Sequence, residues 1–210
     1  MIHYTYWATV VENVDPDGLN RVRVSWKGED DYVTEWVSVV TPYGGHDIGV
    51  SFLPNIDDQV LVAAFDPYNS QKVVIGSIWS NAAAPPRTGE NTAADLNEDG
   101  KNSLRHIKSK SGNQLIFDDT EGAEKIQIIT ADGKSRVEFK ADSELLSLKT
   151  AHDITMRSNG TVSIKAEEVE ISSSGDVNIS SDTFQIDAEG SYENNASNGV
   201  DIEGSGIALN

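Results

Sequence analysis

The sequence predicts an all-β protein in which an N-terminal five-stranded barrel is followed by an intertwined β-helix made by three copies of the chain. Two observations predict it. Residues 1–80 hold five segments of alternating apolar and polar residues, and the second half repeats apolar pairs at i and i+2 about every eight positions. Both patterns place apolar side chains on one face of a β-strand, whereas a helix would repeat them at three and four. The predicted domains are the barrel (1–80), a linker (81–106), a neck (107–136) and a needle (137–210).

The barrel strands are expected where alternating runs lie between turn residues. The expected strands are 6–14, 21–26, 32–40, 59–65 and 72–78, with a turn at 15–18 and a second break at 66–69. Asp, Pro, Asn and Gly at these breaks favour tight turns. Five strands in about 80 residues predict a small closed barrel, and the OB-fold is the common five-stranded one.

The linker and the neck follow. Residues 82–86 read Ala-Ala-Ala-Pro-Pro and precede a polar run, which indicates an extended, irregular segment. Apolar pairs Leu115/Phe117 and Ile126/Ile128 then appear eleven residues apart, with turns expected at 118–122 and 131–133. The longer spacing predicts a wider neck before the regular needle.

The needle is predicted from the shorter repeat. Its apolar pairs, the predicted trimer core, are Val137/Phe139, Leu146/Leu148, Ile154/Met156, Val162/Ile164, Val169/Ile171, Val177/Ile179, Phe184/Ile186 and Val200/Ile202, and a last pair is Ile207/Leu209. Tyr192 stands where one pair is missing, and the residue between each pair, such as Glu138 or Glu170, is expected on the opposite face. A stripe two residues wide must be covered. A single chain coiled with three strands per turn could cover it, but the narrow core favours three chains around one axis.

Composition narrows the function classes. The net charge is −18, which opposes attraction to nucleic acid or anionic lipid headgroups. The absence of cysteine excludes disulfides and thiol chemistry. The opening ten residues have no basic flank and no apolar core segment, so a signal peptide is not expected, and no apolar run approaches the 18 residues of a membrane span.

Several motifs have a chemical and a structural interpretation. Residues 95–100 resemble half of a calcium loop, but the twelfth position is His106 instead of Glu, so a solvated linker turn is preferred. The four histidines, His3, His46, His106 and His152, lack the close spacing of metal ligands. Acid pairs at 30–31, 57–58 and 167–168 could suggest glycosidase carboxylates but fit solvated turns better. We expect no cofactor and no catalytic residue, and no nucleophile elbow, P-loop or dinucleotide motif occurs.

The four tryptophans also allow two interpretations. Trp7, Trp26, Trp36 and Trp79 fall on expected barrel strands. They could offer a stacking face for a sugar or a base. Places in the barrel core or in a protein interface are preferred, because a fold alone does not confer ligand binding.

Five segments of the sequence, taken in order, resemble one family. They are Ala8–Val24 with its Asp-Gly-Leu-Asn-Arg-Val-Arg-Val run, Trp36-Val37 with Pro42–Gly45, Phe52–Phe65, Val73–Trp79 and Ile107–Asp119. Together they are similar to the central spikes of contractile injection systems, which include phage baseplate spikes and VgrG-type spikes. The resemblance covers nearly the whole chain. It implies an OB-fold joined to a triple-stranded β-helix, a homotrimer, and a place in the baseplate of a tail or injection particle assembled in the producing cell's cytoplasm.

The resemblance also implies partners and a mechanical role. A lysozyme domain of the kind some phage spikes carry has no room at 81–106, and the hub domain of VgrG-type proteins is missing, so a separate hub protein is expected above the barrel. No His-x-His motif closes the needle, so a PAAR-type tip protein is expected on Ile207, Leu209 and Asn210. The expected function is non-enzymatic puncture of a target-cell envelope. The alternative is an OB-fold that binds oligosaccharide or nucleic acid, with the repeat as an oligomerisation stalk; a wall hydrolase would need a further domain.

Overall fold

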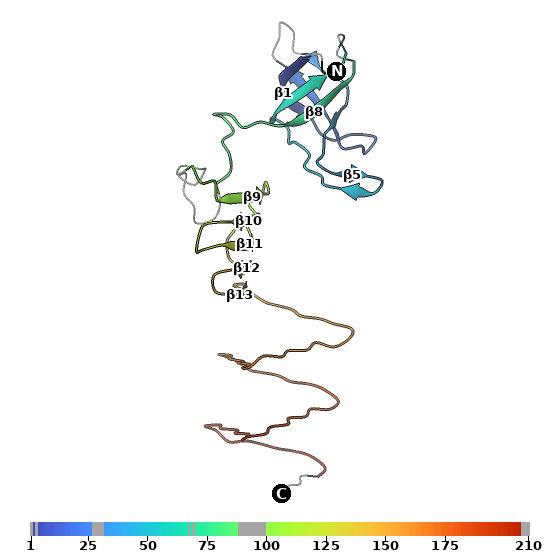
Figure 1. The fold of residues 1–210 in the computed structure, drawn as a ribbon. Helices are drawn as coiled ribbons and strands as arrows, with labels where there is room; N and C mark the ends of the chain where they lie inside the picture. Colours follow the sequence, from blue (N-terminus) through green and yellow to red (C-terminus); the bar gives the residue numbers. More distant parts are fainter. Residues whose placement is uncertain are drawn as a thin grey trace. The chain divides into compact units, whose positions relative to one another are not determined.

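The computed structural model describes residue 2 and residues 4–26, 32–66, 68, 70–87 and 100–206. These residues form strands, turns and extended chain, without a helix, as the all-β prediction required. It follows that the described residues contain no helix long and apolar enough to cross a membrane. The chain divides into two units, Met1–Thr155 and Met156–Asn210. The first unit holds a barrel and a separate five-stranded sheet (Figure 1).

The barrel is a closed, all-β structure. Its strands are β1 (Tyr4–Glu12), β2 (Arg21–Trp26), β3 (Tyr32–Val33), β4 (Val37–Val39), β7 (Gln59–Ala64) and β8 (Lys72–Ser77). Their order is β1-β7-β8-β4-β2-β3, and β1 also pairs with β2, which closes the sheet. The β4–β8 pairing is parallel and the others are antiparallel. With β3 and β4 taken as one strand, this is a five-stranded closed barrel consistent with an OB-fold.

Alternation along the strands builds the barrel core. Val22 and Val24 of β2 are fully buried, while Arg21 and Arg23 point outward and are half-buried. The main core cluster consists of Ala8, Val10, Val22, Val24, Val37, Val60, Val62 and Val74. Valine suits such a core because its branched side chain packs well on a pleated surface. Each fully buried valine contributes about 1.5–3 kcal/mol relative to an exposed one.

The third barrel strand, predicted as continuous over 32–40, is interrupted by a bulge. Between its pairings with β2 at Val33 and Val37, it uses one residue more than β2 does. Thr34 fills the gap: its N donates to the carbonyl of Val24 (2.9 Å), and its Oγ1 accepts from the N of Val24 (3.0 Å). The extra residue bends the strand, which helps the sheet to close.

A small hairpin that the sequence analysis did not predict projects from the barrel. It consists of β5 (Gly44–Gly45) and β6 (Ile48–Gly49). The N of Val50 donates to the carbonyl of Tyr43 (3.0 Å), and Thr41 Oγ1 donates to the carbonyl of Val50. Gly49 is required at its position, because a Cβ there would lie 2.8 Å from the carbonyl oxygen of Tyr43.

The five-stranded sheet is an antiparallel meander. Its strands are β9 (Leu104–Lys108), β10 (Gln114–Asp118), β11 (Lys125–Ile129), β12 (Arg136–Lys140) and β13 (Leu145–Lys149), each paired with the next (Figure 1). The predicted turns at 118–122 and 131–133 are present, with Gly122 and Gly133 at positive φ. The strand β9 begins inside the predicted linker. The strands β12 and β13 belong to the same antiparallel sheet, so the pairing changes after Lys149 and not at the neck–needle boundary of 136/137.

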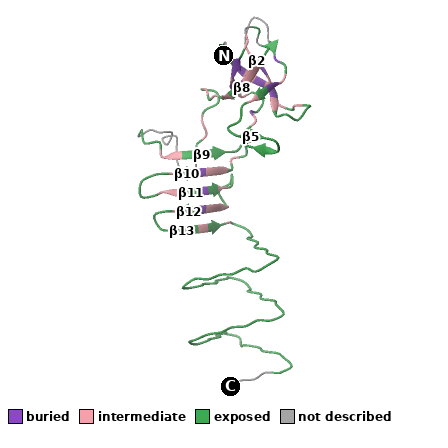
Figure 2. Ribbon diagram, turned by 45° about the vertical axis from the view of Figure 1, so that its right-hand side comes forward, coloured by how far each residue is buried: buried purple, intermediate pink, exposed green. Residues whose placement is uncertain are grey.

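From residue 151 to residue 206, a stretch that includes the described part of the second unit, the chain is extended. No residue of 151–206 belongs to a strand or helix, and every one is exposed (Figure 2). The chain of this unit winds back and forth in an open coil (Figure 1). The repeated short strands predicted here have no pairing partner within the single chain.

Candidate functional site and assembly surface

One face of the meander is apolar, and the strand register builds it from the predicted pairs. Two rows run across the strands: Leu115, Ile128, Val137 and Leu148 in one, and Phe117, Ile126, Phe139 and Leu146 in the other. We call these eight residues the apolar face. Because directly opposed side chains on one face are neighbours, each row is a continuous ridge.

The apolar face is open in the single chain. Leu146 and Leu148 are 57% and 60% exposed, and Phe139 is 50% exposed. Ile107 of β9 extends the same surface and is 47% exposed. A contiguous apolar surface that is exposed in this way indicates an interaction site.

The opposite face of the meander is polar, as predicted for Glu138. Glu138 Oε2 accepts a hydrogen bond from Gln127 Nε2, and both residues are buried. Arg136 and Lys140, on the same strand, lie 3.4 and 3.6 Å from the carboxylate. Burial alone would raise the pKa of Glu138, but the Gln127 bond and the two cations outweigh it and lower the pKa. The carboxylate is therefore ionised and fixes β11 to β12.

These side chains line a cavity of about 430 Å³ on the polar face. Lys125 pairs there with Asp118 at 3.5 Å. Glu138 and Asp118 thus each have a cation beside them, whereas Asp132, which also lines the cavity, accepts from Thr130 Oγ1 (2.7 Å) and from the N of Lys134 (3.1 Å). Among the described residues no buried side-chain polar atom lacks a hydrogen-bond partner. This arrangement stabilises the sheet. Of this cluster, only Glu138 was predicted to lie on this face; the alternation of Arg136, Glu138 and Lys140 with apolar residues was the signal for the rest.

The second unit carries the predicted needle pairs on an unpaired backbone. In residues 151–206 no backbone-to-backbone hydrogen bond is formed. The polar contacts are local, such as the N of Gly160 donating to Ser158 Oγ (3.1 Å). The paired side chains are exposed: Val177 58%, Ile179 67% and Phe184 63%. A conformation with neither internal backbone-to-backbone hydrogen bonds nor buried apolar surface requires partners for both.

The predicted sites divide into three groups in the structure. Val137, Phe139, Leu146 and Leu148 lie together on the apolar face. The remaining core residues follow after β13, the first of them at the end of the first unit and the others in the second unit, and all are exposed: Ile154, Met156, Val162, Ile164, Val169, Ile171, Val177, Ile179, Phe184, Ile186, Val200 and Ile202. The tip residues Ile207, Leu209 and Asn210 lie outside the described residues.

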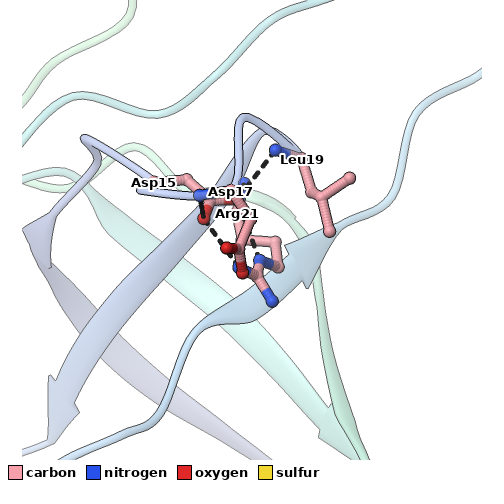
Figure 3. Close-up of polar contacts among 4 residues, drawn as sticks. All are labelled: Asp15, Asp17, Leu19 and Arg21. Atoms are coloured by element: carbon pink, nitrogen blue, oxygen red, sulfur yellow. Dashed lines mark hydrogen bonds and ion pairs between the residues drawn. The ribbon is translucent and has the colours of Figure 1, made fainter.

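The loop between β1 and β2 is the densest polar network in the described barrel (Figure 3). Arg21 donates from Nε and Nη2 to the carboxylate of Asp15 (2.8 and 2.7 Å), and the backbone N of Asp17 and Leu19 donate to it as well. The side chain of Asp15 is 3% exposed. The Arg21 hydrogen bond, aided by the backbone donors and against the effect of burial, holds the pKa of Asp15 well below its usual range. The loop is therefore rigid.

This loop is joined to the base of the hairpin. Asn20 Nδ2 donates to Ser51 Oγ (2.8 Å). Around the junction four large apolar side chains are exposed: Leu19 65%, Tyr43 59%, Ile48 56% and Phe52 64%. The loop and the hairpin, joined by this hydrogen bond, together expose these apolar side chains. This is expected of a surface that binds another protein.

The tryptophans separate into two classes. Trp26 is half-buried, with ring centroids 4.9 Å from Tyr6 and 4.8 Å from Tyr32, so it is packed between neighbours and not open for stacking. Trp36 is also half-buried. Trp7 and Trp79 are 60% and 64% exposed and are not core residues. The exposed pair fits the interface interpretation of the tryptophans better than the core interpretation.

The other motifs form no chemical site in the described part of the chain. Residues 95–99 of the calcium-like motif, the acid pair at 30–31 and His3 lie outside the described residues. His46 and His152 are exposed, and His106 is half-buried with its pKa lowered by desolvation and by Lys108. Among the residues described, no group of three or more His, Asp or Glu side chains could hold a metal ion.

Comparison with known proteins identifies the barrel. Residues 6–79 match the type VI secretion system/phage-baseplate injector OB domain. The matched segment begins in β1 and ends just after β8, so it covers the closed barrel. No curated protein matches the chain. The predicted baseplate-type OB domain is thereby confirmed for this part of the chain.

Proposed function

We propose that this chain, with its injector-type OB domain at residues 6–79, is the central spike of a contractile injection particle. Its role is structural: three copies form a stiff needle that the contracting machine pushes through a target-cell envelope. One observation carries the proposal. An OB domain of this type is followed in the same chain by an exposed apolar face and then by residues 151–206, which have regular apolar pairs and no internal backbone hydrogen bonds.

Three copies would supply what the single chain lacks. Three meanders with their apolar faces turned inward would enclose Phe117, Phe139 and Leu148 in a three-sided prism. Beyond Lys149 the chains would wind around the same axis, so that each strand pairs with strands of the other copies. The result is a β-helix without free strand edges, which suits mechanical load and avoids aggregation.

The partners follow from this role. A separate hub protein docks on the barrel, for which the β1–β2 loop, the hairpin and the exposed tryptophans offer surfaces. A PAAR-type tip protein sits on Ile207, Leu209 and Asn210. The trimer would carry 3 × −18 = −54 charges, which disfavours nucleic acid as a partner. The function needs no enzymatic activity and no cofactor, and it places the chain in a phage tail or injection particle.

The experiment that tests the proposal is size-exclusion chromatography with light scattering on the full chain. The expected mass is that of a trimer, 3 × 22.7 = 68.1 kDa, which resists heating. A monomer of 22.7 kDa at micromolar concentration would refute the spike, because the apolar face would then stay exposed.

A further inference from the structure

One position in the second unit interrupts the apolar repeat. The pairs Phe184/Ile186 and Val200/Ile202 lie sixteen residues apart, and midway between them stand Tyr192 and Asn194. Asn194 occupies the second place of a pair. Every other pair within 151–206 has Ile or Met there. A polar side chain therefore replaces an apolar one at a position that the repeat turns toward the core.

The three Val/Ile pairs before Phe184/Ile186 do not by themselves fix how the chains align. Val162/Ile164, Val169/Ile171 and Val177/Ile179 are chemically identical, and their valines are similarly exposed at 52%, 55% and 58%. A local shift of one chain by one repeat would replace a Val/Ile layer by another Val/Ile layer. Strand register is weakly specified where the alternatives bury the same side chains.

Asn194 distinguishes these alignments. Its amide carries two N–H donors and one carbonyl acceptor. In an aligned trimer three Asn194 amides meet at one level, and each can donate to the next around the three-fold axis, which closes a ring of hydrogen bonds. In a shifted alignment each amide lies against an apolar layer without a partner, and a buried unpaired amide is costly.

We infer that Asn194 sets the register in which three copies of the chain wind together. This inference rests on the trimer proposed above. The amide layer lowers the maximal stability of the needle but favours one alignment of the three chains. A single buried Asn has the same effect in a coiled coil.

The test is distance measurement between spin labels in the full chain. The protein has no cysteine, so Gln185→Cys gives one labelled site per chain, on the outward position between Phe184 and Ile186. Double electron–electron resonance on an aligned trimer gives one narrow distance. The test variant is Asn194→Val. The matched control is Asn178→Val, the same change at the outward position between Val177 and Ile179.

The expected outcome is specific to Asn194. Asn194→Val should keep the trimer mass and an equal or higher melting temperature, while the aligned distance falls to roughly half of the population or less and further distances appear. Asn178→Val should keep the single distance. An unchanged single distance in Asn194→Val, or equal broadening in both variants, overturns the register role while leaving the trimer intact. A labelled parent of monomer mass overturns the trimer and the register role together.

Discussion

At the scale of single residues, Asp15 shows how one buried carboxylate organises a loop. Its oxygens accept from two nitrogens of Arg21 and from the backbone N of Asp17, Leu19 and Arg21. Five donors satisfy a group that would be costly to bury alone. The turn at 15–18 was predictable from its Asp, Pro and Gly residues, but the bond from Arg21 depends on β2 returning beside β1.

Asp15→Asn should lower the melting temperature of the barrel by several degrees and reduce its sensitivity to acid. The pKa of Asp15 is lowered in the folded chain, so its ionised form stabilises the barrel above about pH 4, and this contribution is lost as the pH falls through the lowered pKa. Asp17→Asn is the control, because Asp17 is 66% exposed and contacts only Arg21 through its side chain. Circular dichroism melts at pH 7 and pH 3 measure both variants; an equal loss from Asp17→Asn would contradict the assigned role.

At the scale of secondary-structure elements, the predictions from sequence agree with the structure where they rest on a local pattern of residues. The strand β2 matches its predicted bounds, because alternation of Arg and Val determines both the strand and its buried face. The bulge at Thr34 was not predictable, because it depends on hydrogen bonds to Val24 of the neighbouring strand β2. The hairpin was missed because its two-residue strands consist mostly of glycine and have no alternation.

The extent of the meander also differed from the prediction. An i, i+2 pair looks the same whether its strand pairs within one chain or with another copy. The spacing of the pairs held the missing signal: the steps are eleven from Leu115 to Ile126 and from Ile126 to Val137, nine to Leu146, and eight only from there to Ile154. The last longer step reaches β13, where the antiparallel pairing ends. Which residues share the apolar face was predictable from the sequence. That three copies of the chain cover this face stays a prediction, because the covering depends on other chains.

For the hairpin, Gly49→Ala should disorder β5 and β6 while the barrel stays folded. The new Cβ would meet the carbonyl oxygen of Tyr43 at 2.8 Å, so the hydrogen bond from Val50 to that carbonyl must break or lengthen. We expect a local cost of about 1–3 kcal/mol. Hydrogen exchange at the amide of Val50 should accelerate by one order of magnitude or more. Gly76→Ala, where an added Cβ meets nothing within 4 Å, is the control and should leave that exchange unchanged.

At the scale of the whole molecule, charge is distributed unevenly along the chain. Residues 101–150 carry nine Lys or Arg and eight Asp or Glu, so the net charge is 9 − 8 = +1, whereas residues 151–210 carry 2 − 11 = −9. In a trimer the meander would therefore be nearly neutral and the needle strongly acidic. An acidic surface keeps wound needles from associating side by side.

The proposed trimer would separate two substitutions that a single chain would tolerate equally. Val177→Asp would place three carboxylates together on the axis at a cost of several kcal/mol, whereas Glu170→Ser changes an outward residue. In the isolated chain Val177 is 58% exposed, so the same change would cost almost nothing without assembly. Light scattering and thermal melts should show loss or weakening of the trimer for Val177→Asp alone. Equal behaviour of the two variants would show that the faces are wrongly assigned.

In the proposed trimer, the unpaired backbone of residues 151–206 would also determine the kinetic order of folding. A segment without backbone-to-backbone hydrogen bonds of its own has no unimolecular folded state to reach, so the needle would form only through collision of three chains. Its formation rate should fall steeply on dilution, while the finished needle would come apart only by unwinding three interlocked strands. Such an object persists because its disassembly is slow. At low concentration the chains would therefore stay unassembled. An assembled needle would persist after the conditions under which it formed have changed.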